Sequence, residues 1–198
     1  MTHTRTVGIL VFDKVEVLDL AGPFEVLSVA SRLSKREGRP AFRPLLIGAQ
    51  DRPVVARGGF RVLPDATLAE HPRLDVLIVP GGVVHAVRDD RPTVEWVRQQ
   101  AGLVELVASV CTGAFVLAEA GVLDGLRVTT HWEDQEDLAR DFPALSVVAD
   151  VPWVDQGRVV TSGGISAGID MTLHLVQRLA SRELARATAH QMEYRWPA

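Results

Sequence analysis

One cysteine stands where the sequence predicts nucleophilic chemistry. Cys111 is the only cysteine among 198 residues. It lies between an apolar β-branched run and an alanine- and leucine-rich segment, and 109–113 reads Ser-Val-Cys-Thr-Gly. This is the small-x-nucleophile-x-Gly form of a nucleophile elbow, with Ser in place of the usual first Gly. Because the unpaired N–H groups at a helix start lower a thiol pKa, we predict a thiolate nucleophile. The alternative is a small buried apolar residue.

Backbone N–H groups near this turn are candidates for holding negative charge on a bound molecule. One is the N–H of Thr112, directly after the cysteine, and others belong to Gly81 and Gly82, after another apolar run. Ligands of open α/β sheets bind at the carboxyl ends of strands, where both segments are expected. We therefore predict an anion-stabilising pocket of backbone donors. The alternative for Pro80-Gly81-Gly82 is an ordinary tight turn.

Two titratable side chains are expected at the same edge. Asp19 interrupts an apolar stretch just after the first strand, and His131 ends another strand. A carboxyl group in an apolar pocket has a raised pKa and can exchange a proton with a neighbouring thiol or substrate. We predict that Asp19 is the acid partner of Cys111, with a helix cap as the alternative. His131 is predicted to reach the edge of the site, and a structural role is its alternative.

The elements that must position these residues alternate between strands and helices. We predict strands at 7–12, 42–47, 75–79, 105–110, 127–130, 147–154 and 158–161, a hairpin over 54–62, and helices at 20–33, 92–101, 112–120, 133–140, 167–179 and 181–192. Strands that are apolar on both faces, each followed by a helix, indicate a mostly parallel sheet covered on both sides. The fold class is therefore α/β, with a single domain over residues 1–198.

Composition and charge narrow the possible partners. The net charge is -4, the sequence pI is about 5.9, and no basic stripe suggests a nucleic-acid partner. The apolar run near the N-terminus is too short for a signal peptide or a membrane span. One cysteine cannot form an internal disulfide, and no Cys/His cluster has zinc-site spacing. We expect a cytoplasmic protein with no membrane partner and no structural metal.

Five motifs in order along nearly the whole chain carry a family resemblance. They are Leu-Asp-Leu-Ala-Gly-Pro-Phe-Glu at 18–25, Val-Pro-Gly-Gly at 79–82, Ser-Val-Cys-Thr-Gly-Ala at 109–114, Thr-Thr-His-Trp at 129–132 and Gly-Gly-Ile-Ser-Ala-Gly-Ile-Asp at 163–170. Together they resemble the ThiJ/PfpI superfamily. The resemblance implies a flavodoxin-like three-layer sandwich related to class I glutamine amidotransferases. It also implies a reactive cysteine on the elbow and a homodimer.

Within that superfamily the chain most resembles isonitrile hydratases, which add water to an isonitrile, R–N≡C, and release an N-substituted formamide. The resemblance implies that Cys111 attacks the isonitrile carbon and that Asp19 protonates this carbon and later helps to activate water. Thr112, Gly81 and Gly82 would line the anionic pocket, and no cofactor is implied. The Asp at position 19 and the Thr at position 112 both favour this branch.

Other branches of the superfamily remain as alternatives. Intracellular peptidases carry His directly after the cysteine, where this chain has Thr112. AraC-type regulators resemble this chain in the motif Thr-Thr-His-Trp-Glu-Asp at 129–134, and their domain of this superfamily senses a small molecule. Because the sequence ends at Ala198, we expect no helix-turn-helix module after it. A small-molecule sensor or a thiol-based stress-protection protein remains the alternative to a hydratase.

Overall fold

A seven-stranded sheet forms the centre of the protein. The computed structural model describes residues 3–36 and 38–196. The strand order is β10-β11-β7-β6-β1-β2-β5, and every neighbouring pair is parallel except β10 and β11. These strands are β1 (Arg5–Val11), β2 (Phe42–Gly48), β5 (Ala66–Thr67), β6 (Val76–Val79), β7 (Leu106–Val110), β10 (Trp153–Asp155) and β11 (Val159–Ser162). The mostly parallel sheet expected from the apolar runs is confirmed.

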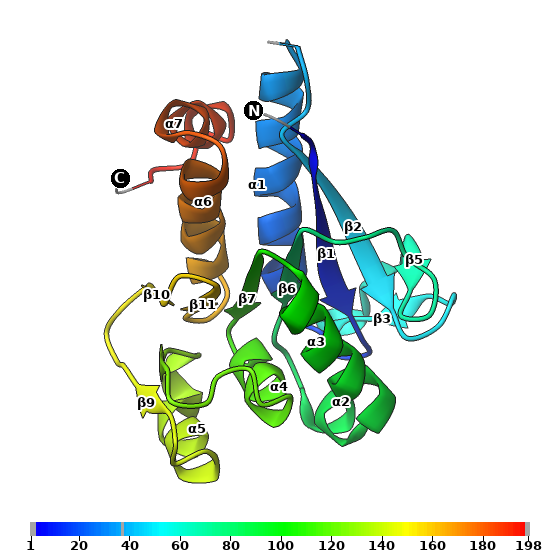
Figure 1. Cartoon of the computed structure of the whole chain (residues 1–198), viewed down its shortest axis with the longest axis vertical. Coiled ribbons are helices and arrows are strands. Elements are labelled where there is room, and N and C mark those ends of the chain that lie inside the picture. Colours follow the sequence, from blue (N-terminus) through cyan, green and yellow to red (C-terminus); the bar gives the residue numbers. More distant parts are fainter. Residues whose placement is uncertain (1–2, 37, 197–198) are drawn as a thin grey trace.

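Helices cover both faces of this sheet (Figure 1). One face carries α1 (Val17–Arg36), α6 (Ala167–Leu179) and α7 (Arg182–Gln191), and the other carries α2 (His85–Asp89), α3 (Arg91–Leu103), α4 (Gly113–Glu119) and α5 (Gln135–Asp141). Successive residues of a strand point to opposite faces. Val76 and Ile78 therefore join one buried cluster, and Leu77 and Val79 join the other. The predicted three-layer α/β sandwich is confirmed.

The parallel pairing brings the chemically interesting segments to one edge. Val79 at the end of β6 pairs with Ser109 of β7, so Gly81 and Cys111 each follow that pair by two residues. β1 lies on the other side of β6, and the chain that leaves it enters α1, which carries Asp19 in its first turn. The carboxyl ends of adjacent parallel strands are where α/β folds bind ligands.

Two short sheets lie outside the central one. β3 (Val54–Val55) and β4 (Arg61–Val62) pair antiparallel around the turn η1 (Arg57–Gly59), which confirms the predicted hairpin. β8 (Arg127–Val128) pairs with β9 (Ser146–Val147), so the strand predicted at 127–130 does not join the main sheet.

The single strand predicted at 147–154 is wrong, because its two ends belong to different sheets. β9 ends at Val147, and β10 begins at Trp153. Between them Asp150 adopts a positive φ of 56°, and Pro152 has no N–H to give to a ladder. The chain uses this interruption to leave β9 and enter the edge of the central sheet.

The helix prediction misses α2, and among the predicted helices it differs mainly at the start of α1. The helix begins at Val17, three residues before the predicted start, and Pro23 lies inside it. The prediction placed Pro23 in the first turn, where proline is tolerated. At the other end of the chain, Ser181 caps α7, because its side chain accepts the N–H of Leu184 at 3.1 Å.

Candidate active site

Cys111 sits on a strained turn between β7 and α4. Its φ is 57°, a left-handed conformation that costs a residue with a Cβ about 1–3 kcal/mol. The turn is held on both sides of the cysteine. The Cys111 N–H donates to the carbonyls of Ser162 and Gly163, each at 3.2 Å, and its carbonyl accepts the Thr130 hydroxyl at 2.8 Å. This is the predicted nucleophile elbow.

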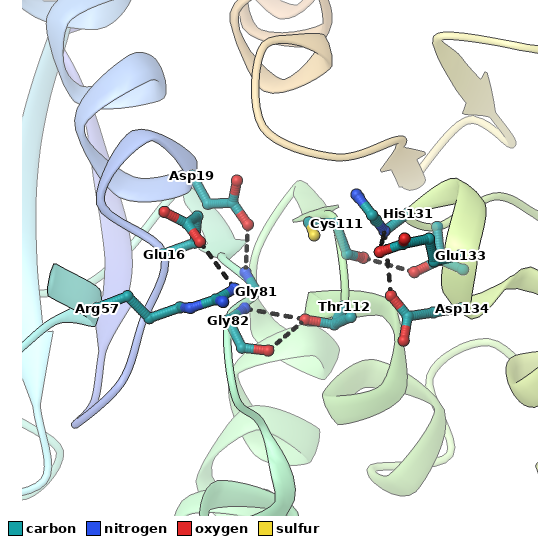
Figure 2. A network of polar contacts seen from close by, with 11 residues as sticks. Glu16, Asp19, Arg57, Gly81, Gly82, Cys111, Thr112, His131, Glu133 and Asp134 are labelled. Carbon is teal, nitrogen blue, oxygen red and sulfur yellow. Dashed lines mark hydrogen bonds and ion pairs between the residues drawn. The ribbon is translucent and has the colours of Figure 1, made fainter.

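Asp19 is fully buried beside this turn and is tied to the β6 end. Its Oδ2 accepts the N–H of Gly81 at 3.1 Å, whereas Oδ1 has no hydrogen-bond partner at ordinary distance among the described residues. Figure 2 shows Asp19 and Cys111 above the Gly81 segment. Asp19 thus binds the loop after β6 rather than the end of its own helix, and its carboxyl group also interacts with the Cys111 thiol and with the N–H of Ile165.

Thr112 forms a second set of hydrogen bonds between the end of β6 and the end of β7. Its hydroxyl accepts the N–H of Gly82 and donates to the carbonyl of Gly82, both at 2.9 Å (Figure 2). Gly82 has a φ of 134°, and a Cβ there would lie 2.3 Å from the carbonyl oxygen of Lys14. The Gly81-Gly82 segment is therefore a close-packed junction. The N–H groups of Gly81 and Gly82 already donate to Asp19 and Thr112, so these predicted donors are not directly available to an anion. The Thr112 N–H, in contrast, hydrogen-bonds the Cys111 thiol.

Proximity and burial change the protonation of both acidic groups. Burial raises the pKa of Asp19 to about 6, although the Gly81 N–H partly opposes this. Burial, and then the Asp19 carboxylate, raise the pKa of the Cys111 thiol to about 12. This direction is opposite to the lowered thiol pKa expected from a helix start, because burial removes solvent from the thiol and the Asp19 carboxylate faces the sulfur. From about pH 6 to about pH 12 the pair carries one negative charge, which lies on the Asp19 carboxylate while the thiol keeps its proton.

The cavity above Cys111 is small and mostly polar. Its volume is about 240 Å³, less than the roughly 300–1,000 Å³ of pockets that take drug-sized ligands. It is lined by Glu16, Arg57, Gly82, Cys111, Thr112, His131, Glu133, Asp134 and Ile165. His131 reaches the site as predicted, and its Nδ1 lies 3.2 Å from Asp134 Oδ2. The structure thus brings together all six residues singled out in the sequence, with Asp19 and Gly81 directly behind this lining.

Several lining residues were not found from the sequence. Glu133 and Asp134 directly follow His131 and Trp132, so their adjacency to a predicted site residue was an available signal. Arg57 carries no local signal, because it comes from the hairpin and reaches the site by pairing with Glu16 at 3.0 Å. Ile165 has an unusual φ of 55° that the sequence does not reveal.

Substituting Gly81 by alanine is expected to damage the site more than the fold. An added Cβ would lie 2.6 Å from Thr112 N and 2.9 Å from Cys111 Cβ, so the elbow must move. We expect a loss of about 1–3 kcal/mol in unfolding free energy and of about 10–10²-fold in any Cys111-dependent rate. Gly102→Ala, near the end of α3 and with open space around its Cβ, is the matched control. Denaturant unfolding and a rate assay check both, and equal effects of the two substitutions would contradict the close-packing argument.

Neither a metal cluster nor a membrane span occurs in the part of the chain that the structure describes. Residues 3–36 and 38–196 contain no group of three or more His, Cys, Asp or Glu side chains that could hold a metal ion. No helix among these residues is long and apolar enough to cross a bilayer.

Known proteins resemble this chain in sequence and in fold. The sequence matches the DJ-1/PfpI family over residues 5–178. An isonitrile hydratase of Pseudomonas putida is 38% identical over 189 residues, covering 95% of this chain and 78% of the hydratase. The HTH-type transcriptional regulator GbdR of Pseudomonas aeruginosa is 34% identical over 97% of this chain, which spans only 51% of the regulator. A ThiJ/PfpI family protein from Pseudomonas syringae superposes with a TM-score of 0.86 at 27% identity, over 97% of this chain and 76% of that structure.

Proposed function

Because the chain belongs to the DJ-1/PfpI family, we propose that it is a cysteine-dependent hydratase, a lyase that converts an isonitrile and water into an N-substituted formamide. The similarity to an isonitrile hydratase over 95% of this chain supports this choice within the family. The observation that carries it is the pairing of a buried thiol with a buried carboxylate of raised pKa at one strand edge.

The chemistry of isonitriles fits this pair of groups. The terminal carbon of R–N≡C accepts both the nucleophile and the proton, so a catalyst must present both at one atom. The Cys111 sulfur is the nucleophile, and Asp19 is the group that receives the thiol proton and returns it. A raised pKa suits Asp19 for both directions of transfer, since the ideal acid–base pKa lies near the working pH.

The first half of the reaction forms a covalent intermediate. The Asp19 carboxylate takes the proton from Sγ while the sulfur attacks the isonitrile carbon, and a new C–S bond forms. The resulting Asp19 carboxylic acid then gives the proton to the same carbon. The product is a thioimidate, R–N=CH–S–Cys111, and Asp19 is again ionised.

The second half releases the formamide. Asp19 accepts a proton from water as the water oxygen attacks the thioimidate carbon, and it then gives this proton to the imine nitrogen, which leaves the tetrahedral adduct R–NH–CH(OH)–S–Cys111. The C–S bond breaks as the carbonyl forms, and Asp19 passes the hydroxyl proton to the departing sulfur, which gives R–NH–CHO and restores the Cys111 thiol. The Thr112 N–H interacts with the sulfur during both halves. Gly81 and Gly82 hold Asp19 and Thr112 in position, and His131 binds substrate at the mouth.

Product labelling tests this function directly. The purified chain is incubated with benzyl isonitrile in D₂O and, separately, in H₂¹⁸O, and N-benzylformamide is followed by NMR and mass spectrometry. We expect one deuterium on the formyl carbon and ¹⁸O in the carbonyl. Absence of formamide above the enzyme-free control, even at enzyme concentrations comparable with the substrate, would rule out the hydratase function.

A sensor is the second candidate, and one specific observation favours it. GbdR, a transcriptional regulator, is 34% identical over 97% of this chain. A sensor would bind a small molecule in the Cys111 cavity without converting it. Saturable binding of an isonitrile with no formamide over many hours, measured on the same sample, would favour this candidate.

The homodimer and the cytoplasmic location expected from the sequence stay predictions.

A further inference from the structure

Acidic groups outnumber basic groups in the lining of the Cys111 cavity. Glu16, Glu133 and Asp134 face a single guanidinium, that of Arg57. Arg57 Nη1 lies 3.0 Å from Glu16 Oε2, so this pair is neutral as a unit (Figure 2). The carboxylates of Glu133 and Asp134 have no lysine or arginine to balance them in the lining.

The imidazole of His131 does not reverse this excess. Its Nδ1 lies 3.2 Å from Asp134 Oδ2 and 3.9 Å from Glu133 Oε2. If the ring is protonated, it balances one of the two carboxylates and the other remains. Asp19, behind the sulfur, adds a further negative charge when it is ionised. In either state of the ring, a molecule that enters the cavity meets a net negative environment.

The field of the Asp134 carboxylate reaches the Cys111 sulfur. Asp134 is among the groups that raise the pKa of the Cys111 thiol, after burial and Asp19. Its side chain is about two-thirds buried, at 35% exposure, whereas Glu133 is 64% exposed. Partly buried charges are screened by salt much less than exposed ones. A charged group on a ligand bound next to the sulfur must therefore interact with Asp134.

We propose that the Cys111 site selects its ligands by charge: it admits neutral and cationic small molecules, such as an isonitrile with an ammonium group, and disfavours those with a carboxylate or sulfonate. The isonitrile part rests on the function proposed above. The charge selection applies to any reagent that reaches the sulfur.

Thiol reagents of different charge measure this selection without requiring turnover. Cys111 is the only cysteine in the sequence, so any thiol modification reports this site alone. The reagents are 2-(trimethylammonio)ethyl, 2-sulfonatoethyl and methyl methanethiosulfonate. Each forms a mixed disulfide with the attacking sulfur and releases methanesulfinate. Rates are followed by intact-protein mass spectrometry and divided by those for 2-mercaptoethanol.

The cationic reagent is expected to react about 10²-fold faster than the anionic one at low ionic strength, since the two reagents differ by two unit charges and each nearby excess carboxylate contributes several-fold per unit charge. The neutral reagent should lie between them, and salt should narrow the range. Equal rates, or a faster anionic reagent, would overturn the proposal.

Two variants show whether the carboxylates of the cavity produce the charge selection. The double substitution Glu133→Gln, Asp134→Asn is expected to lower the cation-to-anion ratio at least tenfold. Glu136→Gln removes a similar exposed carboxylate from the first turn of α5, outside the cavity lining, and should leave the ratio within about twofold. If Glu136→Gln changes the ratio as much as the double substitution, the selection comes from the net charge of the protein and not from the cavity.

Isonitriles of different charge then extend the test to turnover. Benzyl isonitrile should be hydrated at least tenfold more efficiently, in kcat/KM, than isocyanoacetate, which carries a carboxylate. Comparable efficiency for both would overturn the charge selection while leaving the hydratase function intact. If no isonitrile is hydrated, the hydratase function fails, and the ratio of thiol-reagent rates still decides the charge selection.

Discussion

Replacing Cys111 by alanine is expected to reduce isonitrile hydration by at least about 10⁴-fold, to the level of the enzyme-free reaction. The proposed thioimidate needs a sulfur at this position, and the chain has no other cysteine to replace it. The carboxyl group of Asp19 alone offers a proton but no nucleophile. The loss should therefore appear in kcat, with no covalent adduct on the variant by mass spectrometry.

The fold of the Cys111→Ala variant should remain close to that of the wild type. Alanine keeps the Cβ and hence the strained φ of 57°, so the substitution neither relieves nor adds backbone strain. Ser109→Ala, two residues earlier on β7, is the matched control, because the buried Ser109 hydroxyl has no hydrogen-bond partner among the described residues. It should retain activity. Turnover of more than a few per cent in Cys111→Ala would show that another group is the nucleophile.

The sequence was sufficient for features that depend on neighbouring residues. Apolar β-branched runs identified the strands of the central sheet except the two-residue edge strand β5, and the small residues around Cys111 identified the elbow. The order of the motifs also placed Asp19, Gly81 and Cys111 at one edge, because parallel strands end together. Where several turn-forming residues interrupted a predicted strand, as between Val147 and Trp153, the local apolar pattern was misleading.

The raised pKa of Asp19 was predicted from its apolar surroundings, but the raised pKa of the Cys111 thiol could not be predicted from local sequence. A helix start favours a thiolate, but the thiol also loses solvent on burial and faces the carboxylate of another element, α1. The sequence also did not show that the N–H groups of Gly81 and Gly82 are already paired, because their partners are side chains from distant segments. Both properties arise from tertiary contacts, and the role proposed for Asp19 as a base depends on the folded arrangement of Asp19, Cys111 and Thr112.

The substitution Asp19→Asn is expected to lower turnover by about 10²–10⁴-fold, because asparagine cannot accept the thiol proton or return it to carbon. In the wild type the rate should rise with pH through about 6 as Asp19 ionises, and it should then stay level, since the thiol ionises only near pH 12. The variant should lack the rise near pH 6. A pH–rate profile of kcat/KM measures both expectations.

The same substitution is expected to stabilise the fold, by about 1–3 kcal/mol at pH 7. The pKa of Asp19 is raised by burial, so the ionised carboxylate destabilises the folded state. In the wild type this penalty is absent below the unfolded pKa near 4 and complete above about pH 6, so stability falls as pH rises between them. Asparagine has no such penalty and can still accept the Gly81 N–H.

Chemical unfolding at pH 4 and pH 7 distinguishes a catalytic carboxyl group from a helix cap. Glu25→Gln, an exposed charge on the same helix that pairs only weakly with Arg32 at 3.4 Å, is the matched control and should change neither rate nor stability appreciably. A helix cap predicts the reverse for Asp19→Asn, namely lower stability with the rate retained. That result would remove Asp19 from the reaction. Lower activity together with higher stability instead requires a carboxyl group that is buried at a cost to the fold and used by the chemistry.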